Sequence, residues 1–273
     1  MNKKTNSNFD QETDQFLETA IQAARKAGKI QHSYKYEDYS TRRKDLNDIV
    51  TEVDLLCEKA IMSEITSRFP GHGFKSEETV TEINSLKEYI WVIDPLDGTI
   101  NYSSLMPFYS VSLALQKNGE TILGVIFSNE FNELYTVVKN KGAFLNGTPL
   151  HVSSRAELKD SVFSFMMTSH YSDEHRKKII GLIDKVSPHV RGLRLFVSQA
   201  LELAYIATGK LDGHICIKSR GFSAAAGVLL LREAGGHITD IFGNEFGNNA
   251  QSLIASNGIL HDKIMNIVRD VPK

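Results

Sequence analysis

The sequence contains only two cysteines, Cys57 and Cys216, among 273 residues. Two thiols are too few for a disulfide scaffold or for a metal site built from thiolates, so we expect both to be free. The nine histidines are scattered without zinc-ligand spacing. His214 and Cys216 lie close together but lack further partners, a pattern that is more typical of packing than of metal ligation.

Long apolar runs are also missing. No segment reaches the roughly 20 apolar residues of a membrane-spanning helix, and the polar start, Met1 to Asn8, lacks the apolar core of a secretory signal. The formal net charge of −2 gives no long-range attraction to a nucleic acid polymer. We therefore expect a cytoplasmic protein that binds neither a membrane nor a nucleic acid polymer.

What the sequence does contain is an ordinary globular composition, with 41% hydrophobic and 23% charged residues. A chain of this length can bury a sizeable core, as one large domain or two intimate ones. After a loose tail at residues 1–9, helical spacing of apolar residues predicts a helix from Asp10 to near Gly28. The aromatic and polar segment His32–Thr41 then fits a strand or a loop.

The order of the later elements divides the chain into two halves. Strand patterns at residues 107–116, 121–127 and 133–138, with the hairpin signal Asn118-Gly119, predict an antiparallel meander. Beyond residue 153, predicted strands (162–165, 192–197, 213–217, 237–240, 253–257) alternate with predicted helices (174–186, 200–208, 224–233, 260–268). We therefore predict an α/β protein with an α+β N-terminal half at residues 10–152 and a layered α/β C-terminal half at 153–273.

The most distinctive stretch follows the apolar run Tyr89–Ile93, which predicts a buried strand. Pro95 cannot donate to a sheet ladder, so we expect the strand to end at Asp94 and the chain to turn there. Asp94 and Asp97 would flank the turn as two carboxylates three residues apart. Carboxylates spaced in this way can share hard cations, and the carbonyl of Leu96 can add another oxygen ligand.

Gly98 and Thr99 complete this stretch. Gly98 allows a tight backbone, and Thr99 brings a hydroxyl and an exposed amide at a possible helix start, where an anion can be held. Together with the carboxylates, these groups suit a phosphate held against metal ions. The alternative is an Asx-Pro turn that carries a surface aspartate.

The ordered string Asp94-Pro-Leu-Asp97-Gly-Thr99, with Glu77-Glu78 upstream and Gly235-Gly236 downstream, resembles the inositol monophosphatase family of metal-dependent sugar phosphatases. The resemblance extends from about the first helix to near the C-terminus. It implies a sugar-phosphatase-like α-β-α-β-α sandwich and a homodimer. It also implies a magnesium-dependent phosphomonoesterase that hydrolyses a small phosphorylated polyol, sugar or nucleotide, such as inositol 1-phosphate, with a metal-activated water.

The resemblance also implies roles for individual residues. The implied metal ligands are Glu77, Asp94, Leu96 and Asp97; the implied catalytic residues are Glu77, Thr99 and Asp54; the implied substrate-binding residues are Gly98, Thr99 and Ser198. Asp54 would bond Thr99, whose hydroxyl would help to polarise the attacking water. The residues alone fit an alternative equally well, in which Asp54 or Thr51 caps the helix that follows them and Ser198 caps the helix expected at residues 200–208.

One wall of the implied pocket departs from the family pattern. Phe222-Ser223 stands where the family has Trp-Asp, and that Asp is the third carboxylate around the second metal. Cys216 stands where the animal inositol enzymes have a substrate-binding Glu. We therefore expect two or three Mg²⁺ ions with a weakened second site, and Ser223 is a doubtful position for second-metal binding.

The missing acids leave other functions open. A degenerate phosphatase that serves as a binding or regulatory protein, with little turnover, is the alternative to the enzyme. Lys218 and Arg220 lie in the altered segment, and one interpretation is that they supply positive charge to a substrate with an extra phosphate. The other interpretation is two exposed cations at the end of a strand.

Overall fold

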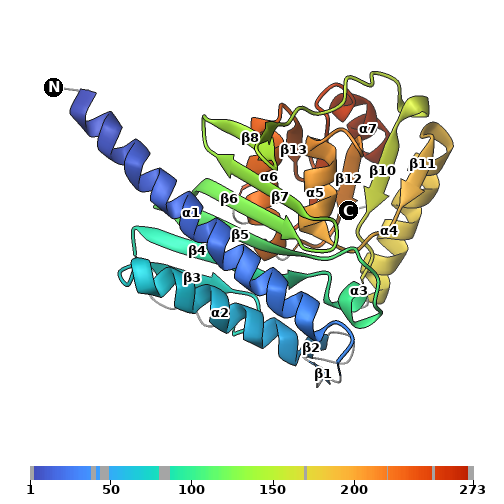
Figure 1. The fold of residues 1–273 in the computed structure, drawn as a ribbon. Coiled ribbons are helices and arrows are strands. Elements are labelled where there is room, and N and C mark those ends of the chain that lie inside the picture. The colour runs from blue at the N-terminus through green and yellow to red at the C-terminus, as the bar shows by residue number, and fades with distance from the viewer. Residues whose placement is uncertain are drawn as a thin grey trace.

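The computed structural model describes residues 3–37, 41–43, 49–79, 87–168, 171–219, 221–247 and 250–269. Across these ranges the chain forms seven α-helices and two larger sheets, stacked in alternating layers (Figure 1). The two layers of strands are separated by a pair of helices, and a further pair of helices covers the outer face of each sheet. The predicted α-β-α-β-α sandwich is confirmed.

The first two layers come from the first half of the chain. Helices α1 (Lys3–Tyr34) and α2 (Glu52–Arg68) pack against each other and on one face of a seven-stranded sheet. The strands of this sheet follow chain order: β3 (Gly73–Ser76), β4 (Tyr89–Asp97), β5 (Ser110–Lys117), β6 (Glu120–Ser128), β7 (Glu133–Val138), β8 (Gly142–Leu145) and β9 (Thr148–Pro149). Only β3 and β4 pair in parallel; the remaining pairs are antiparallel, so the predicted meander is confirmed.

The other layers come from the second half. Helices α5 (Gln199–Ala207) and α6 (Phe222–Glu233) fill the space between the sheets. The second sheet has the order β11 (Gly192–Arg194), β10 (Val162–Phe165), β12 (Gly213–Cys216), β14 (Leu253–Ser256) and β13 (His237–Thr239). Its outer face is covered by α4 (Asp173–Val186) and α7 (His261–Val268). The remaining described elements are short: β1 (Thr41–Arg43), β2 (Ile49–Thr51), α3 (Thr99–Ser103) and the 3-10 helices η1 (Leu158–Asp160) and η2 (Ser187–His189).

Small residues explain how α6 fits between the sheets. A Cβ added to Gly227 would lie 2.8 Å from Leu203 of α5, and one added to Gly124 of β6 would lie 3.0 Å from Ala226. Larger side chains at these points would force the helix away from both neighbours. Cys57 and Cys216 are buried free thiols, as expected. Within the described ranges, no helix is both long and apolar enough to cross a membrane.

The predicted limits of the first helix are wrong. The helix begins at Lys3, inside the predicted tail of residues 1–9, and continues to Tyr34, through the start of the segment His32–Thr41 that was expected to be a strand or a loop. Gly28 does not end it: an added Cβ would lie 2.6 Å from the Phe127 ring, so this glycine allows α1 to approach β6. A packing glycine and a helix-ending glycine look the same in a sequence.

The prediction that the strand ends at Asp94 is also wrong. β4 continues to Asp97 through a bulge: Asp94 pairs with Ser112, Asp97 pairs with Ser110, and Pro95 and Leu96 lie outside the ladder. A bulge accommodates proline because it leaves the residue without a ladder partner. The division of the chain at residues 152 and 153 stays a prediction.

Candidate active site

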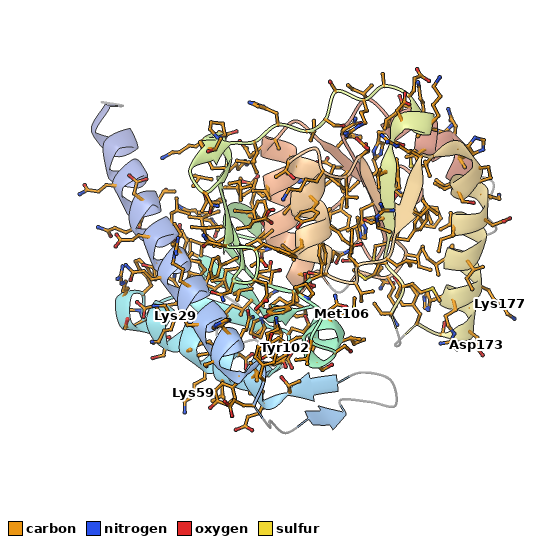
Figure 2. The ribbon with its side chains drawn as sticks, turned by 45° about the vertical axis from the view of Figure 1, so that its right-hand side comes forward. Lys29, Lys59, Tyr102, Met106, Asp173 and Lys177 are labelled. Carbon is orange, nitrogen blue, oxygen red and sulfur yellow. The ribbon has the colours of Figure 1, made fainter. Side chains whose placement is uncertain are left out.

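The bulge in β4 places Asp94 and Asp97 beside each other in the interior, where they are 2% and 7% exposed. The carbonyl freed at Pro95 accepts a hydrogen bond of 2.9 Å from Nε2 of Gln31, a buried residue of α1. Tyr102 in α3 donates its hydroxyl to the Gln31 carbonyl at 2.8 Å, and Figure 2 shows it lying where α1 and α3 meet. The last turns of α1 therefore support the bulge from behind.

Gly98 is required by its backbone. Its φ of +94° lies in the left-handed region, and an added Cβ would lie 3.0 Å from the Phe108 carbonyl oxygen. A side chain here would meet backbone that cannot move aside. Gly98 thus lets the chain pass directly from the bulge into α3, which begins at Thr99.

Asp54 serves two partners, one with each carboxylate oxygen. Oδ2 accepts from the Thr51 amide at 2.8 Å and from the Thr51 hydroxyl at 2.5 Å, which forms a capping box at the start of α2. Oδ1 accepts from the Thr99 hydroxyl at 3.1 Å. The structure therefore combines the two alternatives for Asp54, since the helix cap also positions the carboxylate that orients Thr99.

Asp97 is held by the start of α5. Oδ2 accepts from the Ser198 hydroxyl at 2.6 Å and from the Ala200 amide at 2.9 Å, while Oδ1 accepts from the Gln199 amide at 3.2 Å. The carboxylate thus satisfies amides that the first turn of a helix leaves without partners. Burial raises the pKa of Asp97 to about 6, although these donors act to lower it.

The predicted substrate contact of Ser198 is not supported by its position. Ser198 is 0% exposed and lies behind Asp97, where its hydroxyl is donated to the carboxylate. It stands at the N-cap position of α5, but its side chain makes no capping hydrogen bond, because Asp97 already occupies the helix amides. Ser198 therefore positions Asp97 instead of facing a ligand.

Glu77 lies beside Asp94, as the predicted site requires. It follows β3, which pairs in parallel with β4, and its amide donates to the Ile93 carbonyl at 3.1 Å. Burial, and then the charges of Glu77 and Asp97, raise the pKa of Asp94 well above its usual range. Three acidic side chains from separate parts of the sequence therefore gather in one place and repel one another.

Ser223, at the start of α6, lies at the position expected from the altered motif. Its hydroxyl donates to Oδ2 of Asp94 at 2.5 Å. The side chain is therefore within bonding distance of a predicted metal ligand, but it adds no negative charge. The other carboxylate oxygen of Asp94, Oδ1, accepts from the Leu96 amide at 3.1 Å.

These groups surround one cavity of about 90 Å³. From the first half of the chain, the cavity is lined by Glu77, Asp94, Leu96, Asp97, Gly98, Thr99 and Ile100. From the second half, it is lined by Met166, Thr168, Val197, Gln199, Cys216, Lys218 and Ser223. Lys218, which is exposed, is the only cation among the described lining residues. Arg220, its predicted partner in recognising an extra phosphate, lies outside the described residues.

Magnesium fits the donor set of this cavity. Carboxylates and a backbone carbonyl are the oxygen ligands that a hard divalent cation prefers, and a cation would relieve the repulsion that raises the pKa of Asp94. In the part of the chain that the structure describes, no three His, Cys, Asp or Glu side chains form a ready-made metal cluster. Asp94 and Asp97 instead bond to protein donors, so ion binding would compete with these hydrogen bonds.

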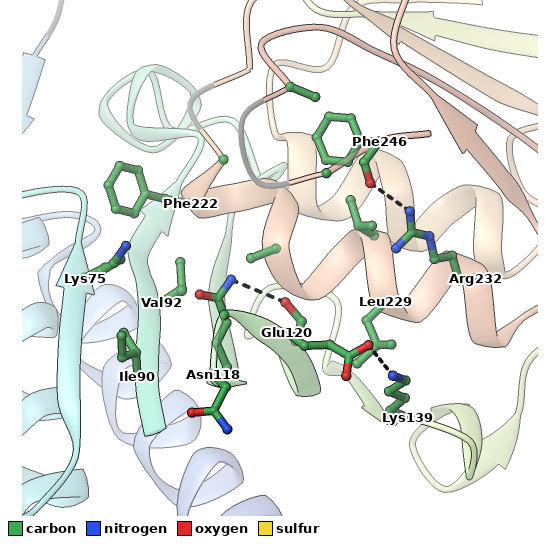
Figure 3. Close-up of a pocket in the computed structure, with 18 of the residues that line it drawn as sticks. Lys75, Ile90, Val92, Asn118, Glu120, Lys139, Phe222, Leu229, Arg232 and Phe246 are labelled. Carbon is green, nitrogen blue, oxygen red and sulfur yellow. Dashed lines mark hydrogen bonds and ion pairs between the residues drawn. The ribbon is translucent and has the colours of Figure 1, made fainter. Parts of the chain in front are cut away.

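A larger cavity of about 1060 Å³ lies between α6 and the strands β3 to β6 (Figure 3). Charged side chains line it, but several form pairs with one another, such as Lys139 with Glu120 and Arg232 with Glu245. Its described acids have separate partners, since Glu233, the third of them, accepts from the amides of Asn140 and Gly142. The candidate active site is therefore identified by the chemistry of the residues that line the smaller cavity, and not by cavity volume.

Several residues of the site were missed from the sequence. Gln31 supports the bulge from 64 residues away, and no local pattern indicates such a contact. Val197 lines the cavity with a φ of +58°, which is rare for a β-branched residue and costs free energy. Gln199, next to the predicted Ser198, also lines the cavity. Of these residues, only Gln199 could have been identified from the sequence as a candidate site residue, because it follows Ser198 at a junction between a strand and a helix.

The chain is similar over nearly its whole length to known proteins. The profile of the inositol monophosphatase family matches residues 12–273. Inositol monophosphatase 3 of Solanum lycopersicum is 35% identical over 266 residues, with 94% of this chain and 97% of that protein covered. The fructose-1,6-bisphosphatase/inositol-1-monophosphatase of Thermotoga maritima is 34% identical, with 93% and 96% covered.

A solved structure gives the same result for the fold. The extragenic suppressor protein suhB from Bartonella henselae superposes with a TM-score of 0.89 at 32% sequence identity. The match covers 93% of this chain and 98% of that one. The similarity therefore includes both sheets and the helices between them.

Proposed function

This chain belongs to the inositol monophosphatase family, and we propose that it is a magnesium-dependent phosphomonoesterase. Its substrate would be a small phosphorylated polyol, sugar or nucleotide. The observation that carries the proposal is the gathering of Glu77, Asp94 and Asp97 around one cavity, where their mutual repulsion calls for a cation. Thr99, oriented by Asp54, adds a hydroxyl at the same cavity.

Each residue has a distinct part in the proposed reaction. Glu77, Asp94, the Leu96 carbonyl and Asp97 would hold Mg²⁺, which supplies positive charge to the phosphoryl oxygens and lowers the pKa of the attacking water. Thr99 donates its proton toward Asp54 and keeps lone pairs free to orient that water. Glu77 takes the proton of the water, and the amides of Gly98 and Thr99 bond a phosphate oxygen.

Release of inorganic phosphate tests the proposal. We expect the purified protein to hydrolyse inositol 1-phosphate or a generic sugar phosphate only when Mg²⁺ is present. Asp97→Asn should lower the rate by at least about 100-fold, because it removes a charge from the ion site. A matched control is Asp173→Asn, since Asp173 is an exposed residue at the start of α4 (Figure 2) and is not among the described residues that line the cavity.

The alternative proposal is a degenerate phosphatase with a binding or regulatory role. Ser223 in place of an acid, and Cys216 on the same wall, favour it because both remove ligand charge from the cavity. A wild-type rate equal to that of Asp97→Asn, with normal folding of both proteins, would favour this alternative over the enzyme.

A further inference from the structure

The side chain of Gln199 presents an unpaired donor at the wall of the active-site cavity. Gln199 is 4% exposed and lines the cavity. Its Oε1 accepts a hydrogen bond of 2.9 Å from the Ser219 hydroxyl. Its Nε2 is fully buried and has no hydrogen-bond partner among the described residues. Because Ser219 occupies the oxygen edge of the amide, the nitrogen edge is the one turned toward Cys216, which also lines the cavity and whose thiol pKa is raised mainly by burial, while the Gln199 side chain acts to lower it.

A buried amide without an acceptor is unusual, because its loss of water is not compensated by another hydrogen bond. The cost is recovered if a bound molecule supplies the acceptor. The position of Gln199 limits what that molecule can be. Its own amide holds Asp97, so the side chain extends from the same point of α5 that positions a predicted metal ligand.

The rest of this wall offers donors and neutral groups. Lys218 is a cation, and Thr168 has a hydroxyl that is also buried and unpaired in the described structure. The Cys216 thiol, whose pKa burial raises to about 11, is neutral at physiological pH. Ser223 donates its proton to Asp94. On this side of the cavity, therefore, no described lining residue is an acid that would accept the hydroxyl protons of a polyol.

We propose that Gln199 is a specificity-determining residue, whose Nε2 donates to an acceptor on the alcohol part of the substrate. The preferred substrate would be a phosphate ester with an acceptor-rich group, such as a carboxylate or a second phosphate, near the ester oxygen, and not a plain polyol phosphate. Lys218 adds positive charge on the same side. This inference deepens the proposed phosphatase function and depends on it.

A matched pair of esters tests the preference. 2-Phosphoglycerate and glycerol 2-phosphate carry the phosphate on the same carbon, but the first has a carboxylate where the second has a hydroxymethyl group. Glycerol 1,2-bisphosphate and glycerol 2-phosphate form a second pair, which tests a second phosphate on the neighbouring carbon as the source of the acceptor. We expect a higher kcat/KM for at least one acceptor-bearing ester than for its partner, carried mainly by a lower KM.

Variants at Gln199 assign the preference to its donor. Gln199→Met keeps the length of the side chain and removes the donor, and it should lower the ratio of kcat/KM values within the preferred pair by about tenfold. Gln199→Glu replaces the donor by a negative acceptor and should lower the ratio further. Gln116→Met, on β5 at the larger cavity, is the matched control and should leave the ratio unchanged.

Calorimetric binding of the same esters in the presence of Mg²⁺ gives a readout that does not require turnover. Unequal affinities within a pair that become equal in Gln199→Met support the inference even if the protein hydrolyses neither ester, in which case only the proposed enzyme fails. Equal affinities in the wild type, or a preference that survives in both variants with normal melting temperatures, would overturn it.

Discussion

At the scale of single residues, the acidic groups of the site also hold the protein together. Asp54 caps α2 and orients Thr99, and Asp97 bonds the first amides of α5. Each carboxylate is therefore fixed by the elements around it before any ligand binds, which reduces the ordering that binding would require. Because each carboxylate has both roles, a variant at either position disturbs the start of a helix as well as the proposed chemistry.

Ser223→Asp should strengthen magnesium binding. The serine hydroxyl already contacts Asp94, so an aspartate here would place a further negative oxygen beside the predicted ligands. We expect a lower magnesium concentration at half-maximal rate, about tenfold or more, measured by titrating the activity with Mg²⁺. An unchanged magnesium dependence would mean that residue 223 is not beside the ion.

A control is needed because the substitution also changes the net charge. Ser187→Asp adds the same charge at the exposed end of α4. It should leave the magnesium dependence of the rate unchanged.

How far the site could be predicted differs from residue to residue. The bond between Asp54 and Thr99 followed from the family resemblance, and the structure contains it. Ser198 was predicted to contact the substrate because it matches a family position that does so. Its bond to Asp97, and its absence from the described lining of the cavity, follow only from the fold. That Nε2 of Gln199 has no hydrogen-bond partner among the described residues depends on the three-dimensional packing, which no sequence pattern expresses.

At the scale of elements, α1 matters for the site although no residue of its sequence suggests it. Its last turns deliver Gln31 to the Pro95 carbonyl, and Pro95 interrupts the ladder between Asp94 and Asp97. The strands and most helices of the second half were predicted to within a few residues, because each has a local hydrophobic period and clear ends. The extent of α1 depended on the packing of Gly28 against Phe127, a long-range contact.

Gln31→Met should therefore affect both stability and activity. It removes the donor to the Pro95 carbonyl and leaves that buried oxygen without this hydrogen bond. We expect the free energy of unfolding to fall by about 1–2 kcal/mol and kcat to fall as the bulge relaxes, measured by urea denaturation and by phosphate release. Gln15→Met on the exposed side of the same helix should change neither quantity, and equal effects in the two variants would refute the supporting role.

A buried glutamate and a buried histidine lie next to each other between α5 and β12. Glu202 and His214 are both 0% exposed, with Oε1 3.6 Å from Nδ1. This separation resembles an ion pair, but burial raises the pKa of Glu202 well above its usual range and lowers that of His214 to about 3. Burial therefore favours the neutral form of both groups, and the Ser164 hydroxyl bonds the histidine at 2.8 Å.

Glu202→Gln should stabilise the protein increasingly as the pH rises. Folding raises the pKa of Glu202, so the folded state binds this proton more tightly than the unfolded state does. Wild-type stability is consequently lost as the pH rises from the unfolded value near 4.5 toward the folded value. Glutamine has no proton to lose, so we expect its advantage in melting temperature to grow from pH 5 to pH 8.

His214 acts in the opposite direction in both proteins. Its pKa is lower in the folded state, so stability falls as the pH drops from about 6.5 toward 3. This contribution cancels when the melting temperatures of wild type and Glu202→Gln are compared at each pH. Parallel curves would show that Glu202 does not change its proton affinity on folding.

At the scale of the whole molecule, exposed apolar side chains gather near α3. Leu105, Met106 and Leu195 are 51%, 52% and 52% exposed, and Met106 lies beside α3 at the edge of the molecule in Figure 2. Asn101 of α3 holds Leu195 close to this helix, because its Nδ2 donates to the carbonyl of Phe196, the next residue, at 2.6 Å. Such a grouping suits contact with a second copy of the chain, and we propose that it forms the contact of the homodimer that the family resemblance implies.

Met106→Glu tests the homodimer. A charge at the centre of an apolar contact is costly to bury, so we expect the dimer to dissociate at micromolar concentration, as measured by light scattering after gel filtration. Ile180→Glu is the control, since Ile180 is 54% exposed on α4 and should not change the mass. A wild-type protein that is monomeric at high concentration would contradict the proposal.

The acids proposed to bind the ion come from the bulged strand and its neighbour, whereas much of the remaining cavity wall comes from α5, β12 and α6. The two sets of side chains thus lie on separate stretches of the gene. Mutations in the later stretch can redirect the choice of alcohol without altering the hydrolytic groups. Proteins with this architecture could therefore change their substrate specificity through a few substitutions. Ser223, Cys216 and Gln199 are the positions at which we expect such substitutions to differ between relatives.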